Sequence, residues 1–419
     1  MNRRQLLAMA GAGLLLPRRG GADEPTGTDR KFLIILCQGG WDTTRLFNPA
    51  FGNDNVSMES DAQPYTAGNL TIVDSPDRPT VKRWFDDYND RVAIVNGFEV
   101  RSITHERCLR LLMTGDGAAA ADDWPSVLAA HSTVSRSLPY LVLSGPAFNA
   151  QYTRMVVRVG MNGQLPDLLS GAAVQRGYPQ VELPSEDTVS LQNAVLKSRL
   201  DSASATAGVG AETGFLDAYT ASLADLEALQ STGGVDLSGG QVSELCGGVS
   251  GQIQVAMDAF EGDLARCAMI QYLGNCGPNW DQHSDIQHQS ISFEELFQHL
   301  DIVMDELLNR VGVNGGPLID EVTVLVCSEM GRHPMVNLHG GKDHWTYTSC
   351  MLFGAGVRGG VVVGGYDSAA IGVRVDLETG AEDAAGVSLQ PSNIGATLFA
   401  LGGLDPSLVN ADPIRAVMA

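Results

Sequence analysis

The histidines of this 419-residue chain are unevenly distributed, since six of the eight lie between His283 and His344. Four of these six lie in three segments that also carry carboxylates, at residues 280–288, 327–334 and 340–345. Imidazole nitrogens and carboxylate oxygens are the donors that borderline divalent metals take from proteins. The clustering predicts a site for one or two divalent metal ions, with zinc, calcium and manganese as candidates.

The candidate ligands follow predicted strands or lie in a glycine-rich loop. They are Asp42, Asp281, His283, Glu329 and His344. Taken singly, an aspartate after a strand more often caps a helix. His299, inside an apolar helical pattern, is more simply a packed or solvated residue. The three histidine segments and the segment of Asp42 are all expected at one edge of the sheet. Four such segments are harder to explain as helix caps and packed residues, and they favour a shared site.

A nucleophile is the second requirement, and residues 101–115 offer one. They follow the apolar run 92–95 and place Thr104 at the start of a predicted helix, where the helix dipole and free N–H groups favour an anion. A hydroxyl activated by a metal can attack phosphorus or sulfur. The alternative is that Thr104 only caps the helix, which leaves Ser102, Thr43 and Thr44 as lesser candidates.

Buried strands that alternate with helices must position these side chains. Continuous apolar runs occupy residues 31–37, 92–95, 138–143, 268–273, 322–327 and 350–353. Such runs suit strands covered on both faces, and the helical pattern at 291–311 lies between two of them. The pattern predicts a three-layer α/β/α sandwich with a mainly parallel sheet, whose ligands lie at the carboxyl ends of the strands.

Two tracts depart from this alternation within the predicted domain 23–419. Residues 185–250 are rich in Ser, Ala, Thr and Gly with helical patches, and they predict a helical or flexible insertion or cap. Residues 354–375 are glycine-rich and strand-like, and they predict a small β appendage. No stretch after the first 22 residues is long and apolar enough for a membrane span.

Residues 1–22 have the pattern of an export signal, since an apolar run of about ten residues lies between basic pairs. Arg3 and Arg4 resemble a twin-arginine signal, which predicts passage through the twin-arginine translocase to the periplasm or the extracellular space. An ordinary signal peptide or a lipid-facing anchor is the alternative. Removing this segment takes away four arginines, so a net charge of −22 becomes −26. Such acidity argues against nucleic acid or anionic lipid as a partner.

The motifs together resemble the alkaline phosphatase superfamily, which includes sulfatases. The tract 102–115, ending in Leu-Met-Thr-Gly, is similar to the sulfatase signature around the nucleophile. Residues 328–331 resemble the Asp-His-Gly loop of the superfamily, and residues 341–344 resemble its later glycine-rich loop. Residues 280–283 and 328–344 are most like an exported, uncharacterised bacterial branch, domain of unknown function 1501.

The resemblance implies two metal pockets and an alkaline phosphatase-like fold. The first pocket would consist of Asp42, Thr104 and Glu329, and the second of Asp281, His283 and His344. Arg332 or Lys342 would hold the remaining anionic oxygens of a substrate. The sequence departs from the family because Met330 stands where metal-rich members have His, and because His105 or Thr104 stands where sulfatases have Cys. The short spacing from Asp281 to His283 also leaves His288 as a competing ligand.

These observations predict an exported metal-dependent hydrolase, with a small anionic phosphate or sulfate ester as substrate and Thr104 as the nucleophile. A one-metal or degenerate site is compatible with Met330. The alternative from another class is a noncatalytic periplasmic protein that keeps the fold for binding or for envelope and polymer assembly. The sequence determines neither the substrate nor the oligomeric state.

Overall fold

The computed structural model of the protein describes residues 29–159 except residue 119, residues 184–206, 248–273 and 279–419, and a few single positions between 182 and 223. The chain divides into two units. The smaller unit spans residues 1–26 and 164–234, and it contains helix α7 (Glu186–Thr206), which is mostly exposed. The larger unit spans residues 27–163 and 235–419 and holds every predicted site residue.

An eight-stranded sheet forms the centre of the larger unit, in the order β12–β4–β11–β8–β1–β7–β5–β6. These strands are β1 (Lys31–Leu36), β4 (Val92–Glu99), β5 (Tyr140–Val142), β6 (Val156–Arg158), β7 (Cys267–Gln271), β8 (Val322–Cys327), β11 (Tyr347–Gly354) and β12 (Val361–Val363). Only β11 runs antiparallel to its neighbours. Both β1 and β8 are buried along their whole length, as a sheet covered on two faces requires.

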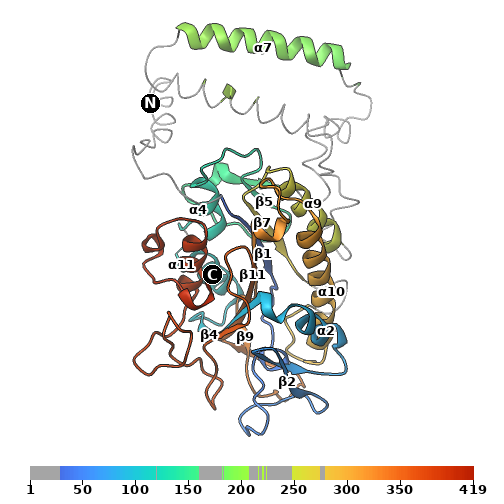
Figure 1. Ribbon diagram of the computed structural model, residues 1–419, viewed down its shortest axis with the longest axis vertical. Helices are drawn as coiled ribbons and strands as arrows, with labels where there is room; N and C mark the ends of the chain where they lie inside the picture. Colours follow the sequence, from blue (N-terminus) through green and yellow to red (C-terminus); the bar gives the residue numbers. More distant parts are fainter. Residues whose placement is uncertain are drawn as a thin grey trace. The chain divides into compact units, whose positions relative to one another are not determined.

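Helices cover the two faces of this sheet, which confirms the predicted three-layer α/β/α fold. As Figure 1 shows, α2 (Pro79–Tyr88), α9 (Val249–Glu261) and α10 (His288–Asn309) lie on one side, and α4 (Trp124–Ala130) and α11 (Pro391–Leu401) on the other. Helix α3 (His105–Thr114) packs against α11. In α10 the spacing of Phe293, Leu296, Phe297 and Leu300 places four buried side chains on one face.

Short elements complete the larger unit. Two small sheets pair β2 (Gln63–Ala67) with β3 (Leu70–Asp74) and β9 (Gly331–Arg332) with β10 (His344–Trp345). The 3-10 helices are η1 (Thr43–Arg45), η2 (Asn89–Arg91), η3 (Thr153–Met155), η4 (Leu318–Asp320), η5 (Pro406–Val409) and η6 (Arg415–Val417). They lie in the connections, so the segments that carry the candidate ligands are short and tightly held.

The predicted site segments meet at one edge of the sheet. The parallel strands β1, β7 and β8 lead at their carboxyl ends into residues 37–42, 272–283 and 328–330. Strand β4 leads into the start of α3. Because β11 is antiparallel, its first residue lies at this same edge, which brings in the preceding β9–β10 pair. Five connections therefore converge where a doubly wound sheet binds its ligands.

Several sequence predictions concern the segments outside this edge. Residues 1–22 lie outside the described part of the chain, as does most of 207–247. The described parts of the tract 185–250 form helix α7 and the beginning of α9. Within 354–375, β12 joins the edge of the main sheet beside β4. Among the described residues, no helix is long and apolar enough to cross a membrane.

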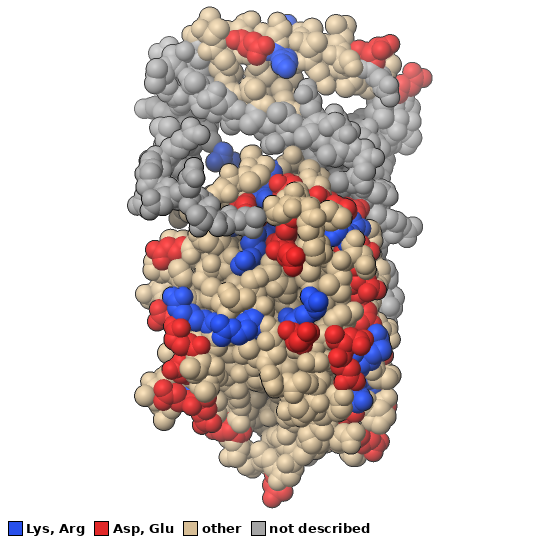
Figure 2. Space-filling view, viewed as in Figure 1, with Lys and Arg blue, Asp and Glu red and all other residues tan. Residues whose placement is uncertain are grey.

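The surface charge is mixed on the face shown in Figure 2, where basic and acidic side chains lie beside one another. Several of the pairs are ion pairs between side chains more than a third exposed, such as that of Lys82 with Asp86. Exposed pairs of this kind contribute little to stability. The visible part of the acidic excess is therefore spread over the surface and does not mark a site.

Candidate metal centre

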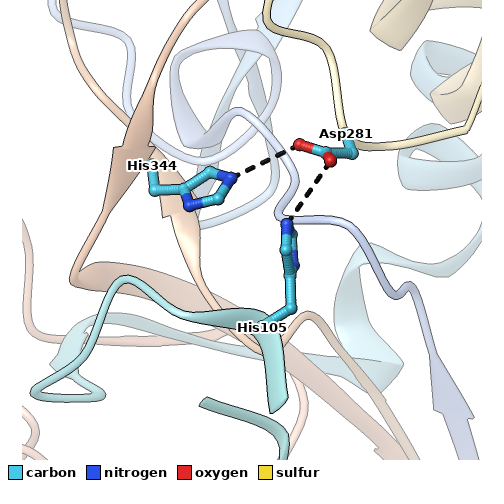
Figure 3. Close-up of side chains that lie close together, drawn as sticks. All are labelled: His105, Asp281 and His344. Carbon is cyan, nitrogen blue, oxygen red and sulfur yellow. Dashed lines mark hydrogen bonds and ion pairs between the residues drawn. The ribbon is translucent and has the colours of Figure 1, made fainter. Parts of the chain in front are cut away.

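Three imidazoles surround one carboxylate at the carboxyl edge of the sheet. Asp281 Oδ1 lies 3.1 Å from His283 Nε2 and 3.4 Å from His344 Nε2. Its other oxygen, Oδ2, lies 3.5 Å from His105 Nε2. The Nε2 atoms of His283 and His344 are 2.9 Å apart. Figure 3 shows the side chains of His105 and His344 both directed at Asp281.

The opposite nitrogen of each imidazole is held by an acceptor. His105 Nδ1 is 2.7 Å from Glu329 Oε1, and His344 Nδ1 is 2.6 Å from the carbonyl oxygen of Ile103. His283 Nδ1 is 3.2 Å from a carboxylate oxygen of Asp343. These acceptors require a proton on Nδ1, which leaves the lone pair of each neutral ring on Nε2. Metal-binding histidines are oriented in this way, by a carboxylate or carbonyl behind the ring.

The spacing of the donor atoms fits one small divalent ion. Two ligands about 2.0–2.2 Å from a tetrahedral metal lie roughly 3.3–3.6 Å apart. Four separations among the Nε2 atoms and the two carboxylate oxygens of Asp281, from 2.9 to 3.5 Å, are close to that range. One donor atom from each of His105, Asp281 and His344 lies within 4.8 Å of the other two. In addition, the Nε2 atom of His105 is buried without a hydrogen-bond partner among the described residues. The second predicted pocket therefore has a donor set and an orphaned nitrogen that suit a metal.

Tight backbone contacts hold these ligands in place. A Cβ atom on Gly39 would lie 2.7 Å from the backbone nitrogen of Asp281, and Gly39 has a φ of +131°, which disfavours other residues. A Cβ atom on Gly341 would lie 2.0 Å from the carbonyl carbon of His283. Both glycines therefore let two chain segments pack closely against the ligand segment 281–283.

Buried aromatic and amide side chains also hold the ligand segment 281–283 in place. Trp280 is fully buried, stacks edge-on against Phe293, and donates its indole N–H to the carbonyl oxygen of Tyr272. Gln289, also fully buried, donates to the carbonyl oxygens of Gly40 and Trp280. The loop after β1 and the loop after β7 are thus tied to each other and to α10.

Arg332 is a buried positioning group in this structure. Its guanidinium donates to the carbonyl oxygens of Gly39, Gly40 and Lys342 and forms an ion pair with Asp281 Oδ1. Burial opposes ionisation of Asp281, but the hydrogen bond and charge of Arg332 hold the pKa of this carboxyl below its ordinary value. These contacts orient the guanidinium, and the role of Arg332 in holding substrate oxygens stays a prediction.

Glu329 is fully buried and supports the imidazole of His105. It accepts hydrogen bonds from the N–H of Gly39 and from the Ser328 hydroxyl. Its hydrogen bond to His105 raises the pKa of that imidazole, while burial acts in the opposite direction. Burial lowers the pKa of His344, and the hydrogen bond to the carbonyl oxygen of Ile103 offsets part of this effect. The net effect raises the pKa of His105 and lowers that of His344.

The first predicted pocket is not assembled. Asp42 Oδ2 is 2.8 Å from Lys342 Nζ and 3.7 Å from Arg45 Nε, and both Asp42 and Lys342 are almost completely buried. Thr44 donates its hydroxyl to Asp42 Oδ1 and accepts from Lys342. Asp42 therefore belongs to a buried ion-pair cluster, whereas Glu329 belongs to the histidine cluster. An ammonium group already neutralises Asp42, and Lys342 is too buried to bind a substrate.

The candidate nucleophiles differ in exposure. Thr104 is exposed at the start of α3, and its side chain makes no capping hydrogen bond. Its neighbours Ile103 and His105 both contact the metal centre. Thr43 and Thr44 are buried, and the Ser102 hydroxyl accepts a hydrogen bond from the backbone N–H of Thr104. Thr104 is thus the most accessible of the four predicted hydroxyls.

Sequence reasoning did not include His105 among the ligands. It named this residue only as occupying the sulfatase nucleophile position. The available signal was the Thr104-His105 pair directly after an apolar strand, at the same sheet edge as the other ligands.

Three other residues that the sequence analysis discussed lie outside the histidine cluster. His288 pairs with Asp285 at 3.5 Å, and His299 contacts the carbonyl oxygen of Glu295 at 2.8 Å within α10. Met330 is fully buried in the core.

The fold and the site together define an α/β/α protein with a histidine–aspartate centre at the carboxyl edge of its sheet. Residues 253–413 match the family described as Protein of unknown function (DUF1501). The matched region contains Asp281, His283, Glu329 and His344 but not His105. No curated protein sequence is significantly similar to the chain.

Three solved structures illustrate what the fold is similar to. A protein in the alkaline phosphatase superfamily from Vibrio parahaemolyticus is 10% identical, with a TM-score of 0.35 over 100% of this chain and 78% of that one. A putative sulfatase from Bacteroides thetaiotaomicron is 9% identical, with a TM-score of 0.38 over 90% and 71%. Ps i-CgsB, in complex with k-i-k-neocarrahexaose, is 10% identical, with a TM-score of 0.41 over 92% and 78%. The likeness is too distant to assign any residue of the site.

Proposed function

We propose that the protein binds one divalent metal ion through Asp281, His105, His283 and His344 and hydrolyses a phosphate or sulfate ester there. The observation that carries this proposal is the shared arrangement of the three imidazoles. Each has an acceptor on Nδ1 and presents Nε2 to the same carboxylate. Packing alone does not require three rings to share this orientation, whereas a metal centre does.

The residues around the centre have distinct roles in this proposal. The bound ion would supply Lewis acidity and lower the pKa of a coordinated hydroxyl or water. Glu329 keeps the proton of His105 on Nδ1, and Arg332 orients the carboxylate of Asp281. The hydroxyl of Thr104 serves as nucleophile at the start of α3, where free backbone N–H groups favour an anionic ester.

Export is part of the same proposal. The basic and apolar pattern of residues 1–22 supports passage through the twin-arginine translocase, which transports folded proteins, so the metal would be bound before export. Fractionation of cells that express the chain with Arg3 and Arg4 replaced by Lys tests this route. Retention of the double variant in the cytoplasm is expected, and its arrival in the periplasm at the wild-type level would contradict it.

Metal content and affinity test the centre itself. Purified protein is titrated with zinc, manganese and calcium in competition with a chelating dye, and the bound metal is counted by elemental analysis. Asp281→Ala and His344→Ala should lose the ion. Glu329→Gln should weaken binding by about 10–100-fold, because it removes a carboxylate behind a ligand. His288→Ala is the matched control, since His288 contacts Asp285 outside the donor set. Equal affinity in all four variants would refute the centre.

Turnover is tested with aryl phosphate, phosphodiester and sulfate substrates. Thr104→Ala should reduce turnover without loss of metal, and Ser102→Ala serves as the control. Unchanged turnover in Thr104→Ala would exclude Thr104 as the nucleophile. Arg332→Lys should retain the ion less tightly, because a lysine cannot bridge three carbonyl oxygens and a carboxylate.

A noncatalytic metal-binding protein is the second candidate function. It is favoured by one observation, namely that Lys342 neutralises Asp42 where the resemblance implies a first metal ion. A protein that binds metal with high affinity and turns over none of the three substrate classes would support this candidate over the hydrolase.

A further inference from the structure

Exposed apolar side chains occur on two segments that contact the histidine cluster through other groups. Ile103 lies beside His344 and is 59% exposed, although its carbonyl oxygen contacts the His344 ring. The second segment, the loop 333–341, carries Met335, Val336 and Leu338, all of them exposed. Scattered exposed apolar residues are common, but three within four positions next to a candidate centre form an unusual patch.

The loop is held rigidly against the ligands. Asn337 donates to the carbonyl oxygen of His283 at 3.0 Å and to the side chain of Asp343 at 3.1 Å. The backbone N–H of Ile286 donates to the carbonyl oxygen of Gly340 at 3.1 Å. Ser57 accepts from the N–H of Val336 at 3.1 Å. Asn337 and the backbone of the loop therefore bind to the segment 283–286 and to Ser57, whereas Met335, Val336 and Leu338 are exposed to solvent.

The charges around the centre limit the charge of a substrate. Asp281, Glu329 and Asp343 are acidic, and Arg332 is the cation that contacts these groups in the described part of the chain. One divalent ion would make the group neutral. Lys342 is committed to Asp42. With the metal-bound group neutral, a bound dianionic ester would leave two negative charges uncompensated, whereas a bound monoanionic ester would leave one.

We propose that the substrate is a monoanionic ester, either a phosphodiester or a sulfate ester, with an apolar chain that packs on Met335, Val336, Leu338 and Ile103. This inference rests on the proposed function and adds the substrate class. The apolar chain of the ester is the proposed occupant of these four side chains, because the segments that carry them contact two of the proposed ligands. Asn337 of the loop contacts His283, and the carbonyl oxygen of Ile103 contacts His344.

Monoanions of graded length test the inference by binding affinity, and the metal-loaded Thr104→Ala variant is used so that the ester is not hydrolysed. Alkyl methylphosphonates from ethyl to octyl are titrated into this variant, and their affinities are measured by calorimetry. Full burial of a methylene strengthens binding about fourfold, and a chain covered on one side should gain about twofold per methylene. Methylphosphonic acid dianion, which has the same head group without the chain, should bind more weakly than the ethyl ester.

Matched variants locate the contact. Leu338→Ser and Val336→Ser should each flatten the dependence of affinity on chain length. Leu408→Ser is the control, because Leu408 is also exposed but lies in η5. Octyl and ethyl esters of equal affinity would overturn the inference while leaving the metal centre intact. A protein that binds neither metal nor any phosphonate would refute the proposed function itself.

One further outcome would also overturn the inference. If the protein binds phosphatidylcholine vesicles without metal, and Leu338→Ser abolishes that binding, the patch is a membrane contact and not a substrate contact. Absence of vesicle binding, together with chain-length dependence that Leu338→Ser flattens, supports the substrate assignment.

Discussion

Replacement of Lys342 by methionine tests the assignment of this lysine to structure and not to substrate binding. The ammonium group lies 2.8 Å from Asp42 Oδ2, and the two side chains are 1% and 0% exposed. Methionine keeps most of the volume of the side chain and removes its charge. Although burial raises the pKa of Asp42, Lys342 and Arg45 hold it below its ordinary value, so removing Lys342 leaves a buried carboxylate with one weaker partner.

The magnitude follows from this geometry. The Coulomb energy of two unit charges 2.8 Å apart is about 6 kcal/mol at an effective dielectric constant of 20. The variant no longer has to remove water from the ammonium group on folding, and this saving offsets part of the lost Coulomb energy. Breaking a buried pair costs about 3–5 kcal/mol, and the remaining contact of Asp42 with Arg45 favours the lower value. We expect Lys342→Met to reduce the free energy of unfolding by about 3 kcal/mol.

Urea-induced unfolding, followed by both circular dichroism and tryptophan fluorescence, measures the change where the two transitions coincide. The double variant Asp42→Asn/Lys342→Met should regain most of the loss, because no buried charge is left unpaired. Lys82→Met is the control, since Lys82 forms an exposed ion pair at 3.8 Å and should change stability by less than about 1 kcal/mol.

Two results would refute the reasoning. A loss below about 1 kcal/mol in Lys342→Met would show that the pair is not a buried structural contact. Loss of the bound metal in a variant that remains folded would place Lys342 in the metal centre. We expect its metal content to equal that of the wild type, because its side chain contacts Asp42, Thr44 and Ser57 and none of the ligands.

Three further predictions concern other contacts. Gly341→Ala should weaken metal binding in the dye titration, because the added Cβ would displace His283, whereas Gly316→Ala, whose Cβ would meet its nearest atom at 3.7 Å, should not. Gln289→Ala should lower Tm, because the variant loses two buried hydrogen bonds to backbone carbonyls, at a cost of about 1–3 kcal/mol. Burial raises the pKa of Asp123 to about 6, above its ordinary value of 3.8, so the folded state binds the proton more tightly and the free energy of unfolding should fall as pH rises from about 4 to 6. Asp123→Asn should remove that slope in urea titrations at several pH values, and an unchanged slope would assign it to other groups.

The central strands could be predicted because a strand buried on both faces reads as a continuous apolar run. Residues 322–327 coincide with β8, and 31–37 contain β1. The short edge strand β6 was not predicted, since three residues with partly exposed side chains give little pattern. The hairpin β2–β3 was missed for the same reason, because most of β2 is exposed. Strand β12 lies in the tract 354–375 that was predicted to be strand-like, but it joins the main sheet beside β4.

The candidate site was partly accessible from sequence. Asp281, His283 and His344 were placed in one pocket, and the structure brings them together. The pairing of Lys342 with Asp42 had no sequence signal, because the two residues lie on opposite ends of the chain and meet only through the sheet order. His105 was not grouped with the ligands, although its position beside Thr104 after an apolar strand was an available signal.

The reversed direction of β11 has a consequence for truncated molecules. His344 lies at the sheet edge because β11 pairs there with β8 and β4, and the cluster combines it with His105 after β4 and Asp281 after β7. A chain that ends before β11 lacks the strand that holds His344 beside Asp281. If the protein binds the proposed ion, metal retention would therefore distinguish molecules in which β4, β7 and β11 are paired from molecules truncated before β11.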